Sequence, residues 1–235
     1  LLVLSNSSNG LSLEKELREK HGSNRVKFYK CDVSSPELGA AFEDVVKNFD
    51  YIDLVVNNAG IMNDSPDVYE KEIAINVTAL VTSTLKAYNL MRKDRGGKGG
   101  TVINISSMVA LYQPALLSVY TATKSAVLQF SNCIGSERNY VISGVRVIAI
   151  CFGCTETALF SEDKLGLLDE ESVSRFKTGI QRLTFQSIES AVNGLVHAVK
   201  HGKSGSTWLV TKGEPAVDIT GNIKEAYSIM SRGIF

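Results

Sequence analysis

The chain lacks an excess of charge of either sign, since 25 lysines and arginines balance 25 aspartates and glutamates. It has no cluster of basic residues, which argues against nucleic acid or an anionic membrane surface as its main partner. Long hydrophobic runs are missing as well, because no apolar stretch approaches the roughly 20 residues that span a bilayer. The sequence therefore predicts neither a nucleic-acid-binding protein nor a membrane protein.

Cysteine and histidine are scarce, with four residues of the first type and three of the second. The cysteines lie in or beside apolar segments, which is typical of reduced, buried thiols and not of a disulfide framework. Cys151 and Cys154 have the C-x-x-C spacing of a metal or redox pair, but no second pair or correctly spaced histidines accompany them. No signal peptide is visible. We expect a cytoplasmic protein without a metal site.

Short β-branched runs alternate with helix patterns along nearly the whole chain. Strands are expected near residues 1–4, 25–31, 52–56, 101–105, 145–151 and 208–211, and the clearest helices over residues 12–21, 118–134 and 187–200. Pro36 opens a further helix whose apolar residues follow the 3.6-residue period. This alternation predicts an α/β fold with a doubly wound parallel sheet. The length of 235 residues, 44% of them apolar, suits one domain over residues 1–235.

Tyr120 and Lys124 lie four residues apart, and Ser107 precedes the tyrosine by thirteen. On a helix over residues 118–134, the phenol and the ammonium share one face. A nearby cation favours the phenolate and lowers its pKa by roughly 1–3 units, towards the range suited to acid–base catalysis. Ser107 follows a buried strand, where its hydroxyl can bind a substrate oxygen. The alternative is a surface tyrosine beside a lysine that reaches into solvent.

Three further features decide between these interpretations. The segment Asn57-Asn58-Ala59-Gly60 ends a strand, and Asn76 interrupts the apolar stripe of the next helix. Gly153 and Thr157 follow another strand. In this order and spacing the features resemble the short-chain dehydrogenase/reductase family, over residues 1 to about 213.

The resemblance implies roles for four residues. Tyr120 is the expected catalytic acid and base, and Lys124 lowers its pKa and holds the ribose of the nicotinamide. Ser107 orients the reacting oxygen. Asn76 positions a water in the proton relay, although a hydrogen-bonded buried amide is the alternative for this residue.

The resemblance also implies cofactor contacts. Asn57, Ala59 and Gly60 line the cofactor, while Gly153 and Thr157 lie on the carboxamide side of the nicotinamide.

Two segments of the chain are expected near the adenosine. Asp32 and Val33 match the family's adenine-contacting pair, with a turn after a strand as the alternative. Asn6 can bind ribose hydroxyls, and residues 5–9 carry neither the acid usual for NAD nor a base for a 2′-phosphate. We expect NAD, with NADP left open.

The same comparison marks what this chain lacks. In the family, a first strand leads into a glycine-rich turn and helix that hold the cofactor pyrophosphate. Residues 1–4 correspond to the family's second strand, so we expect about thirty residues, with the first strand and helix, to be missing. Such a sheet would have two unpaired edges. Phe152 also stands where the family usually has proline, which restores a backbone N–H.

Apolar residues surround the expected site on both sides of the tyrosine, without arginine or lysine among them: Val109, Leu111, Tyr112, Leu116, Leu117, Leu159 and Phe160. They favour a hydrophobic secondary alcohol or ketone as substrate. Within the family, the segments 96–100 (GGKGG) and 205–208 (GSTW) are most similar to the branch of 15-hydroxyprostaglandin dehydrogenase and insect alcohol dehydrogenases.

The expected function is therefore that of an NAD(P)-dependent oxidoreductase. The alternative is a catalytically silent, cofactor-free binding or scaffold protein on the same fold, which the missing glycine-rich segment favours. The resemblance further implies a homodimer or homotetramer, formed through the helices that carry Asn76 and Tyr120.

Overall fold

The computed structural model describes residues 2–5, 7–161 and 164–234. The chain divides into two compact units, Leu1–Ile52 and Asp53–Phe235, and each is described by itself. Within the described ranges, no helix combines the length and the apolar character needed to cross a membrane. The single domain over residues 1–235 stays a prediction.

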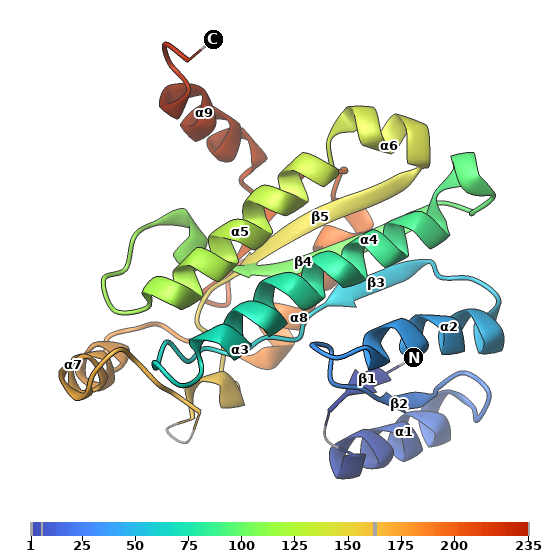
Figure 1. Ribbon diagram of the computed structural model, residues 1–235, viewed down its shortest axis with the longest axis horizontal. Helices are drawn as coiled ribbons and strands as arrows, with labels where there is room; N and C mark the ends of the chain where they lie inside the picture. Colours follow the sequence, from blue (N-terminus) through green and yellow to red (C-terminus); the bar gives the residue numbers. More distant parts are fainter. Residues whose placement is uncertain (1, 6, 162–163, 235) are drawn as a thin grey trace. The chain divides into compact units, whose positions relative to one another are not determined.

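The first unit is a two-stranded parallel sheet with two helices (Figure 1). Strand β1, Leu2–Leu4, pairs with β2, Phe28–Lys30, and the helices are α1, Ser7–His21, and α2, Glu37–Phe49. Gly10 lets α1 approach β2, because a Cβ there would lie 2.3 Å from the ring of Phe28. Helix α1 begins five residues earlier than expected.

The second unit contains a five-stranded sheet in the order β3-β4-β5-β6-β7. The strands are β3 Leu54–Asn57, β4 Gly100–Ser107, β5 Val145–Phe152, β6 Thr207–Val210 and β7 Val217–Asp218. The first four run parallel, which confirms the predicted α/β class, and β7 joins β6 antiparallel. Among the described residues, no strand joins this sheet to the β1–β2 sheet.

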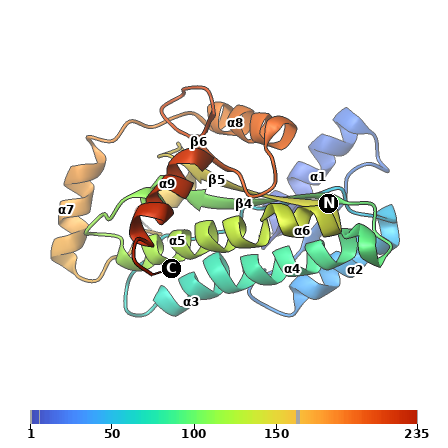
Figure 2. The same cartoon turned by 90° about the horizontal axis from the view of Figure 1, so that it is seen from above.

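Helices cover both faces of the five-stranded sheet (Figure 2). One face carries α4, Leu80–Met91, and α5, Ser118–Ile134, and the other carries α8, Ile188–His201. Alternate residues of β5 explain this layering: Ile148 and Ile150 pack towards Ala198 of α8, while Ala149 and Cys151 pack towards α5. The remaining helical segments of the unit are α3 Tyr69–Ile73, a π-helical turn Ala74–Ala79, α6 Glu137–Ser143, α7 Glu170–Ile180, α9 Thr220–Met230 and the 3-10 turns Lys93–Arg95, Met108–Leu111 and Ala158–Phe160.

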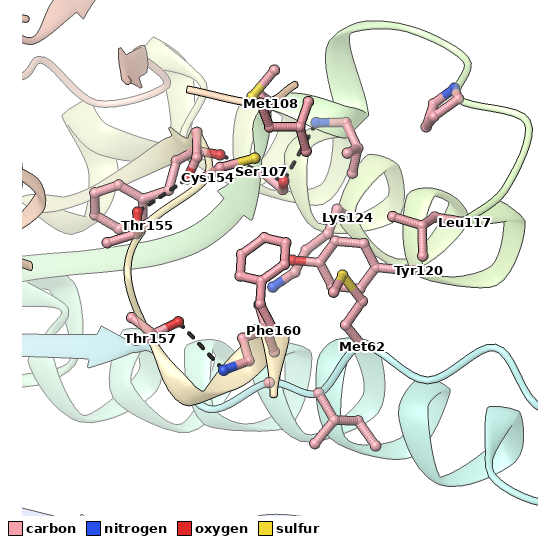
Figure 3. Close-up of a pocket in the computed structure, with 18 of the residues that line it drawn as sticks. Met62, Ser107, Met108, Leu117, Tyr120, Lys124, Cys154, Thr155, Thr157 and Phe160 are labelled. Atoms are coloured by element: carbon pink, nitrogen blue, oxygen red, sulfur yellow. Dashed lines mark hydrogen bonds between the residues drawn. The ribbon is translucent and has the colours of Figure 1, made fainter. Parts of the chain in front are cut away.

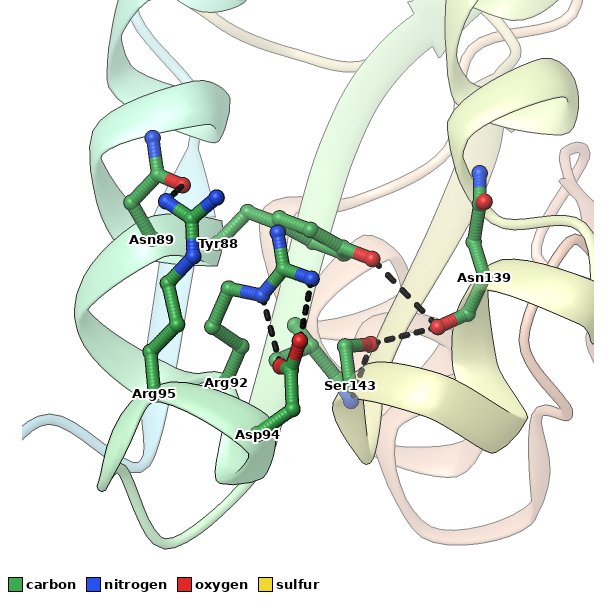
Figure 4. Close-up of polar contacts among 8 residues, drawn as sticks. Tyr88, Asn89, Arg92, Asp94, Arg95, Asn139 and Ser143 are labelled. Carbon is green, nitrogen blue, oxygen red and sulfur yellow. Dashed lines mark hydrogen bonds and ion pairs between the residues drawn. The ribbon is translucent and has the colours of Figure 1, made fainter.

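Polar contacts join the end of α4 to α6 (Figure 4). The hydroxyl of Tyr88 donates a hydrogen bond to the main-chain carbonyl of Asn139 at 3.3 Å, and Ser143 Oγ donates to the same carbonyl at 2.7 Å. Arg92 lies over the Tyr88 ring and forms an ion pair with Asp94 at 2.5 Å. The ion pair is exposed, so it adds little stability. The Tyr88 contact links α4 to α6, while the Ser143 contact lies within α6.

Buried amides and hydroxyls tie β3, β4, α4 and α5 together. Asn104 in β4 lies opposite Asn57 in β3, and its Oδ1 accepts from Asn57 Nδ2 at 2.8 Å and from Thr84 Oγ1 at 3.0 Å. Asn104 Nδ2 donates to Ser131 Oγ of α5 at 2.9 Å. Ser83 Oγ in turn donates to Asn57 Oδ1 at 2.6 Å. Since an unsatisfied buried polar group is costly, this network fixes both helices against the two strands.

We expect Asn104→Leu to lower the free energy of unfolding by about 2–4 kcal/mol, because it keeps the side-chain volume but removes the hydrogen bonds from Asn104 to Asn57, Thr84 and Ser131. Urea denaturation checks the value. The matched control is Asn89→Leu on α4, where the exposed amide accepts from Arg95 at 3.3 Å and the expected change is within about 0.5 kcal/mol. Equal changes in the two variants would contradict the role of the network.

Candidate active site

The site begins with a buried carboxylate at the start of α5. Asp64, in the segment after β3, is fully buried, and its two oxygens accept the main-chain N–H groups of Val119 at 2.7 Å and Tyr120 at 3.0 Å. Leu117, at the N-cap position, has no side chain able to do this. An acceptor from outside the helix therefore satisfies its first N–H groups and meets the positive end of its dipole.

Tyr120 and Lys124 lie side by side on the buried face of α5. Only 6% of the tyrosine and 4% of the lysine are exposed. Lys124 Nζ donates to the Ile105 carbonyl at 3.1 Å and lies 5.6 Å from the centre of the Tyr120 ring. Ser106 Oγ donates to the main-chain carbonyl of Lys124 at 2.8 Å, which fixes this turn of α5 against β4.

Ser107, the last residue of β4, completes the predicted group (Figure 3). Its hydroxyl lies close enough to the phenol of Tyr120 to lower the pKa of that group. The other contacts of Ser107 Oγ are long, 3.5 Å to the Phe152 carbonyl and 3.4 Å from the Val109 N–H. The structure thus brings Ser107, Tyr120 and Lys124 together, and they are not the surface pair of the alternative interpretation.

Burial dominates the proton equilibria of this group. It raises the pKa of Tyr120 above the ordinary value of a phenol, against the lowering effect of the Ser107 hydroxyl. It also lowers the pKa of Lys124 to about 8. The net pKa of the phenol is therefore raised in this structure because the ring is buried, and the expectation that Lys124 lowers it stays a prediction.

Asn76 lies in the π-helical turn and is fully buried. Its Oδ1 accepts the Ile61 N–H at 2.9 Å, while its Nδ2 donates to the Ile61 carbonyl at 2.8 Å and to Thr123 Oγ1 at 3.1 Å. Both N–H groups of the amide donate hydrogen bonds, which agrees with the alternative of a hydrogen-bonded buried amide. The water-positioning role of Asn76 stays a prediction.

A pocket of about 1030 Å³ opens above these residues. Six of the predicted site residues line it: Gly60, Ser107, Tyr120, Lys124, Gly153 and Thr157. Most of the predicted apolar wall lines it too, namely Val109, Tyr112, Leu116, Leu117, Leu159 and Phe160, while Leu111 does not. Asn58, Met62, Met108, Cys154 and Phe176 add to the lining. The pocket lining is therefore mainly apolar, and Ser107, Tyr120 and Lys124 are among its polar residues.

Other predicted cofactor residues lie elsewhere. The Asn57 amide belongs to the buried network with Asn104, and Ala59 is exposed outside the pocket lining. Asp32 and Val33 belong to the first unit, where Asp32 Oδ1 accepts from the N–H and hydroxyl of Ser34 in a turn. Asn6 lies outside the described residues. The cofactor contacts of these residues stay predictions.

Comparison with known proteins gives the family. The model of the short chain dehydrogenase family matches residues 1–166. The chain belongs to the short-chain dehydrogenase family.

Curated relatives fall in the predicted branch. The chain is 35% identical to human 15-hydroxyprostaglandin dehydrogenase [NAD(+)] over 159 residues, which are 67% of this chain and 59% of that protein. It is 38% identical to alcohol dehydrogenase 2 of Ceratitis capitata over 146 residues, 62% of this chain and 56% of the relative. These matches thus span less than two thirds of the relatives' length.

Solved structures of low identity share the fold. One is a 3-ketoacyl-(acyl-carrier-protein) reductase from Brucella melitensis complexed with NADH, with a TM-score of 0.73 and 18% identity over 90% of this chain and 85% of that one. Another is a short-chain dehydrogenase/reductase of unknown function from Caenorhabditis elegans with cofactor, with a TM-score of 0.69 and 20% identity over 88% of this chain and 83% of that one.

The site of this short-chain dehydrogenase fits the family's nicotinamide cofactor in one respect. The ammonium of Lys124 has three N–H groups, and among the described residues only the Ile105 carbonyl accepts from it. Gly60 lies close to it, since a Cβ there would be 3.4 Å from Lys124 Nζ and 3.2 Å from Asn76 Oδ1, and both Gly60 and Lys124 line the open space of the pocket. Buried donors next to open space suit the hydroxyls of a ribose.

Sequence analysis missed two residues of the site, Asp64 and Glu72. Both are fully buried, and Glu72 contributes to the pKa shifts of Tyr120 and Lys124. A signal was present: Glu72 precedes Asn76 by four residues and so shares its buried face of the helix.

We expect the buried lysine to destabilise this short-chain dehydrogenase below pH 8. Lys124→Met removes the cost of burying a charge, on the order of 3 kcal/mol for a pKa displaced from 10.5 to about 8. Because the folded pKa lies below the unfolded one, the stability of the wild type relative to the variant rises between about pH 8 and 10.5. Urea denaturation of both proteins over this range measures the difference between their free energies of unfolding. Groups that titrate alike in both proteins do not affect this difference. A difference that stays constant with pH would contradict the shifted pKa.

Proposed function

We propose that the protein is an oxidoreductase that interconverts a hydrophobic secondary alcohol and its ketone with a nicotinamide cofactor, preferably NAD. The observation that carries the proposal is the position of Ser107, Tyr120 and Lys124, buried together at the polar end of an apolar pocket. The short-chain dehydrogenase family and the names of the relatives, among them an NAD(+) enzyme, support it.

Proton transfer is the task of the chain's own residues. A bound nicotinamide supplies the hydride donor or acceptor. Tyr120 gives a proton to the carbonyl oxygen during reduction and accepts the hydroxyl proton during oxidation. Ser107 donates to the same oxygen and so orients it beside the phenol. Because burial raises the pKa of Tyr120, the phenol is protonated at neutral pH and ready for reduction, whereas oxidation is favoured as the pH rises.

The pocket selects the substrate by its apolar lining. Cations that could bind a carboxylate or phosphate are a minority of the described lining residues, namely Lys71, Lys124, Lys164 and Arg175. A hydrophobic skeleton, by contrast, is surrounded by Val109, Leu117 and Phe160. Burial of each methylene group contributes about 0.8 kcal/mol.

We also propose a homodimer or homotetramer in the cytoplasm. Outward-facing apolar residues on the helices named in the sequence analysis support an oligomer, including Leu85, which is 43% exposed, and the exposed Ala122 and Ala126 of α5. Light scattering coupled to gel filtration gives the oligomeric state.

Tyr120→Phe is expected to lower kcat about 10²- to 10⁴-fold with little change in the KM for the alcohol, because it removes the proton donor and keeps the ring. Oxidation of secondary alcohols with NAD, followed by absorbance, measures the effect. The matched control is Tyr112→Phe, which removes another hydroxyl from the pocket lining and is expected to change kcat by less than about threefold. If the wild type shows no turnover with NAD, the result favours the alternative of a binding protein.

In a series of 2-alkanols, we expect the KM to fall about fourfold for each added methylene until the pocket is filled. The reason is that each additional group leaves water for the apolar lining. Steady-state kinetics with the series checks the trend. A KM independent of chain length would contradict an apolar substrate site.

A further inference from the structure

A second buried carboxyl group lies against Asp64. Glu72, in α3, is fully buried, and the neighbouring carboxyl group of Asp64 helps to raise its pKa. Its Oε1 accepts the main-chain N–H of Asn63 at 3.3 Å. Its Oε2 receives no hydrogen bond from an N–H or hydroxyl group of any described residue. Two buried carboxyl groups thus lie near each other at the start of α5.

Two carboxyl groups close together in a buried place disfavour ionisation of both, which favours one proton on the pair. The hydrogen bonds decide which residue carries it. Asp64 uses both oxygens to accept N–H groups of Val119 and Tyr120, which is the task of a carboxylate at the positive end of a helix. The Oε2 of Glu72 lacks a donor, and a proton on Glu72 lets the acid donate to Asp64 instead.

We propose that Glu72 is a positioning residue for Tyr120. It carries the single proton of the pair and donates a hydrogen bond to Asp64, whose carboxylate holds the main chain of Tyr120. The role in catalysis rests on the function proposed above. The hydrogen-bonded chain from Glu72 through Asp64 to the start of α5 does not depend on it.

Charged and titratable groups surround Glu72 from several sides. Lys124 and Tyr120 approach it from α5, Asp64 from the segment after β3, and its own helix carries Glu70 and Lys71. Burial and the charge of Asp64 raise the pKa of Glu72 from 4.5 to about 8. Ionisation of Glu72 therefore removes its donation to Asp64, and it also raises the pKa of Tyr120 and of Lys124.

The first test is a titration of the carboxyl group itself in the full chain. Carbon-13 NMR of the glutamate carboxyl groups, with the Glu72 signal identified by its loss in Glu72→Gln, is expected to give a midpoint near the pKa of about 8. A midpoint close to 4.5 would overturn the proposal, because Glu72 would then be ionised at neutral pH.

The pH dependence of stability gives an independent reading of the same proton. The pKa of Glu72 is higher in the folded state than in the unfolded state. Its proton therefore contributes fully to the free energy of unfolding below about pH 4.5, and this contribution is lost as the pH rises towards about 8. The urea midpoint of the wild type is therefore expected to fall over this range relative to Glu72→Gln, which stays a neutral donor. Parallel curves would overturn the proposal.

The second test asks whether Glu72 holds Tyr120. Glu72→Leu keeps the side-chain volume but cannot donate to Asp64, and it is expected to speed hydrogen exchange of the Val119 and Tyr120 amides at least about tenfold. Glu72→Gln is expected to keep both rates within about threefold of the wild type, as is the control Glu70→Gln on the exposed face of α3. Unchanged exchange in Glu72→Leu would overturn the proposal.

Activity separates this inference from the proposed function. With an active enzyme, kcat is expected to fall in Glu72→Leu and to be restored in Glu72→Gln, while the KM for the alcohol changes little. Exchange rates that follow the expected pattern in a protein that oxidises no alcohol would support the positioning chain and overturn the function. Equal kcat in Glu72→Leu and the wild type would overturn the catalytic role of Glu72.

Discussion

The buried carboxylate of Asp64 at the start of α5 is the interaction on which the rest of the site depends. An ion removed from water is costly unless hydrogen bonds and charge offset the loss, and here two main-chain N–H groups and the positive end of α5 do so. Those N–H groups belong to Val119 and Tyr120, so the contact fixes the helix at the residue that carries the phenol. Lys124 follows one turn later, and Ser131 two turns further binds Asn104 of β4. A single helix, held at both ends, thus places the reacting group against the sheet.

Dehydration decides the proton chemistry of the site more than any one charge does. At an effective dielectric constant of about 20, a full charge 5.6 Å away, the distance from Lys124 Nζ to the centre of the Tyr120 ring, is worth about 3 kcal/mol. That would lower the pKa of the phenol if nothing opposed it. The same burial displaces the pKa of Lys124 to about 8, so the cation is itself disfavoured, and the nearby Glu72 raises the pKa of the phenol further. A spacing rule in the sequence conveys which groups meet but not how much water they lose.

The strands and the Ser107–Tyr120–Lys124 group were predictable because they depend on local pattern. Continuous β-branched runs gave β4 and β5 nearly to the residue, and i, i+4 geometry brought Tyr120 and Lys124 together. Helix orientation was less accessible: Ala122 and Ala126 of α5 and Ile188 of α8 face outward, although small or apolar residues usually face the core. The pairing of Asp64 with Glu72 could not be predicted from the sequence, since only the fold brings the segment after β3 against α3 and α5. Contacts between distant segments leave no periodic signal.

The segment that carries Asp64 also forms part of the pocket wall, and it therefore connects the pocket with the start of α5. Asn63 Nδ2 donates to the Lys164 carbonyl at 3.0 Å, and the Asp64 N–H donates to the Gly166 carbonyl at 2.8 Å. Gly166 fits closely, because a Cβ there would lie 2.0 Å from Asn63 Oδ1. Lys164 lines the pocket, so a displacement of this wall acts directly on the residue whose carboxylate holds Tyr120. The pocket wall and the start of α5 are therefore joined through one hydrogen-bonded residue, because Asp64 contacts Gly166 with its main chain and Tyr120 with its carboxylate.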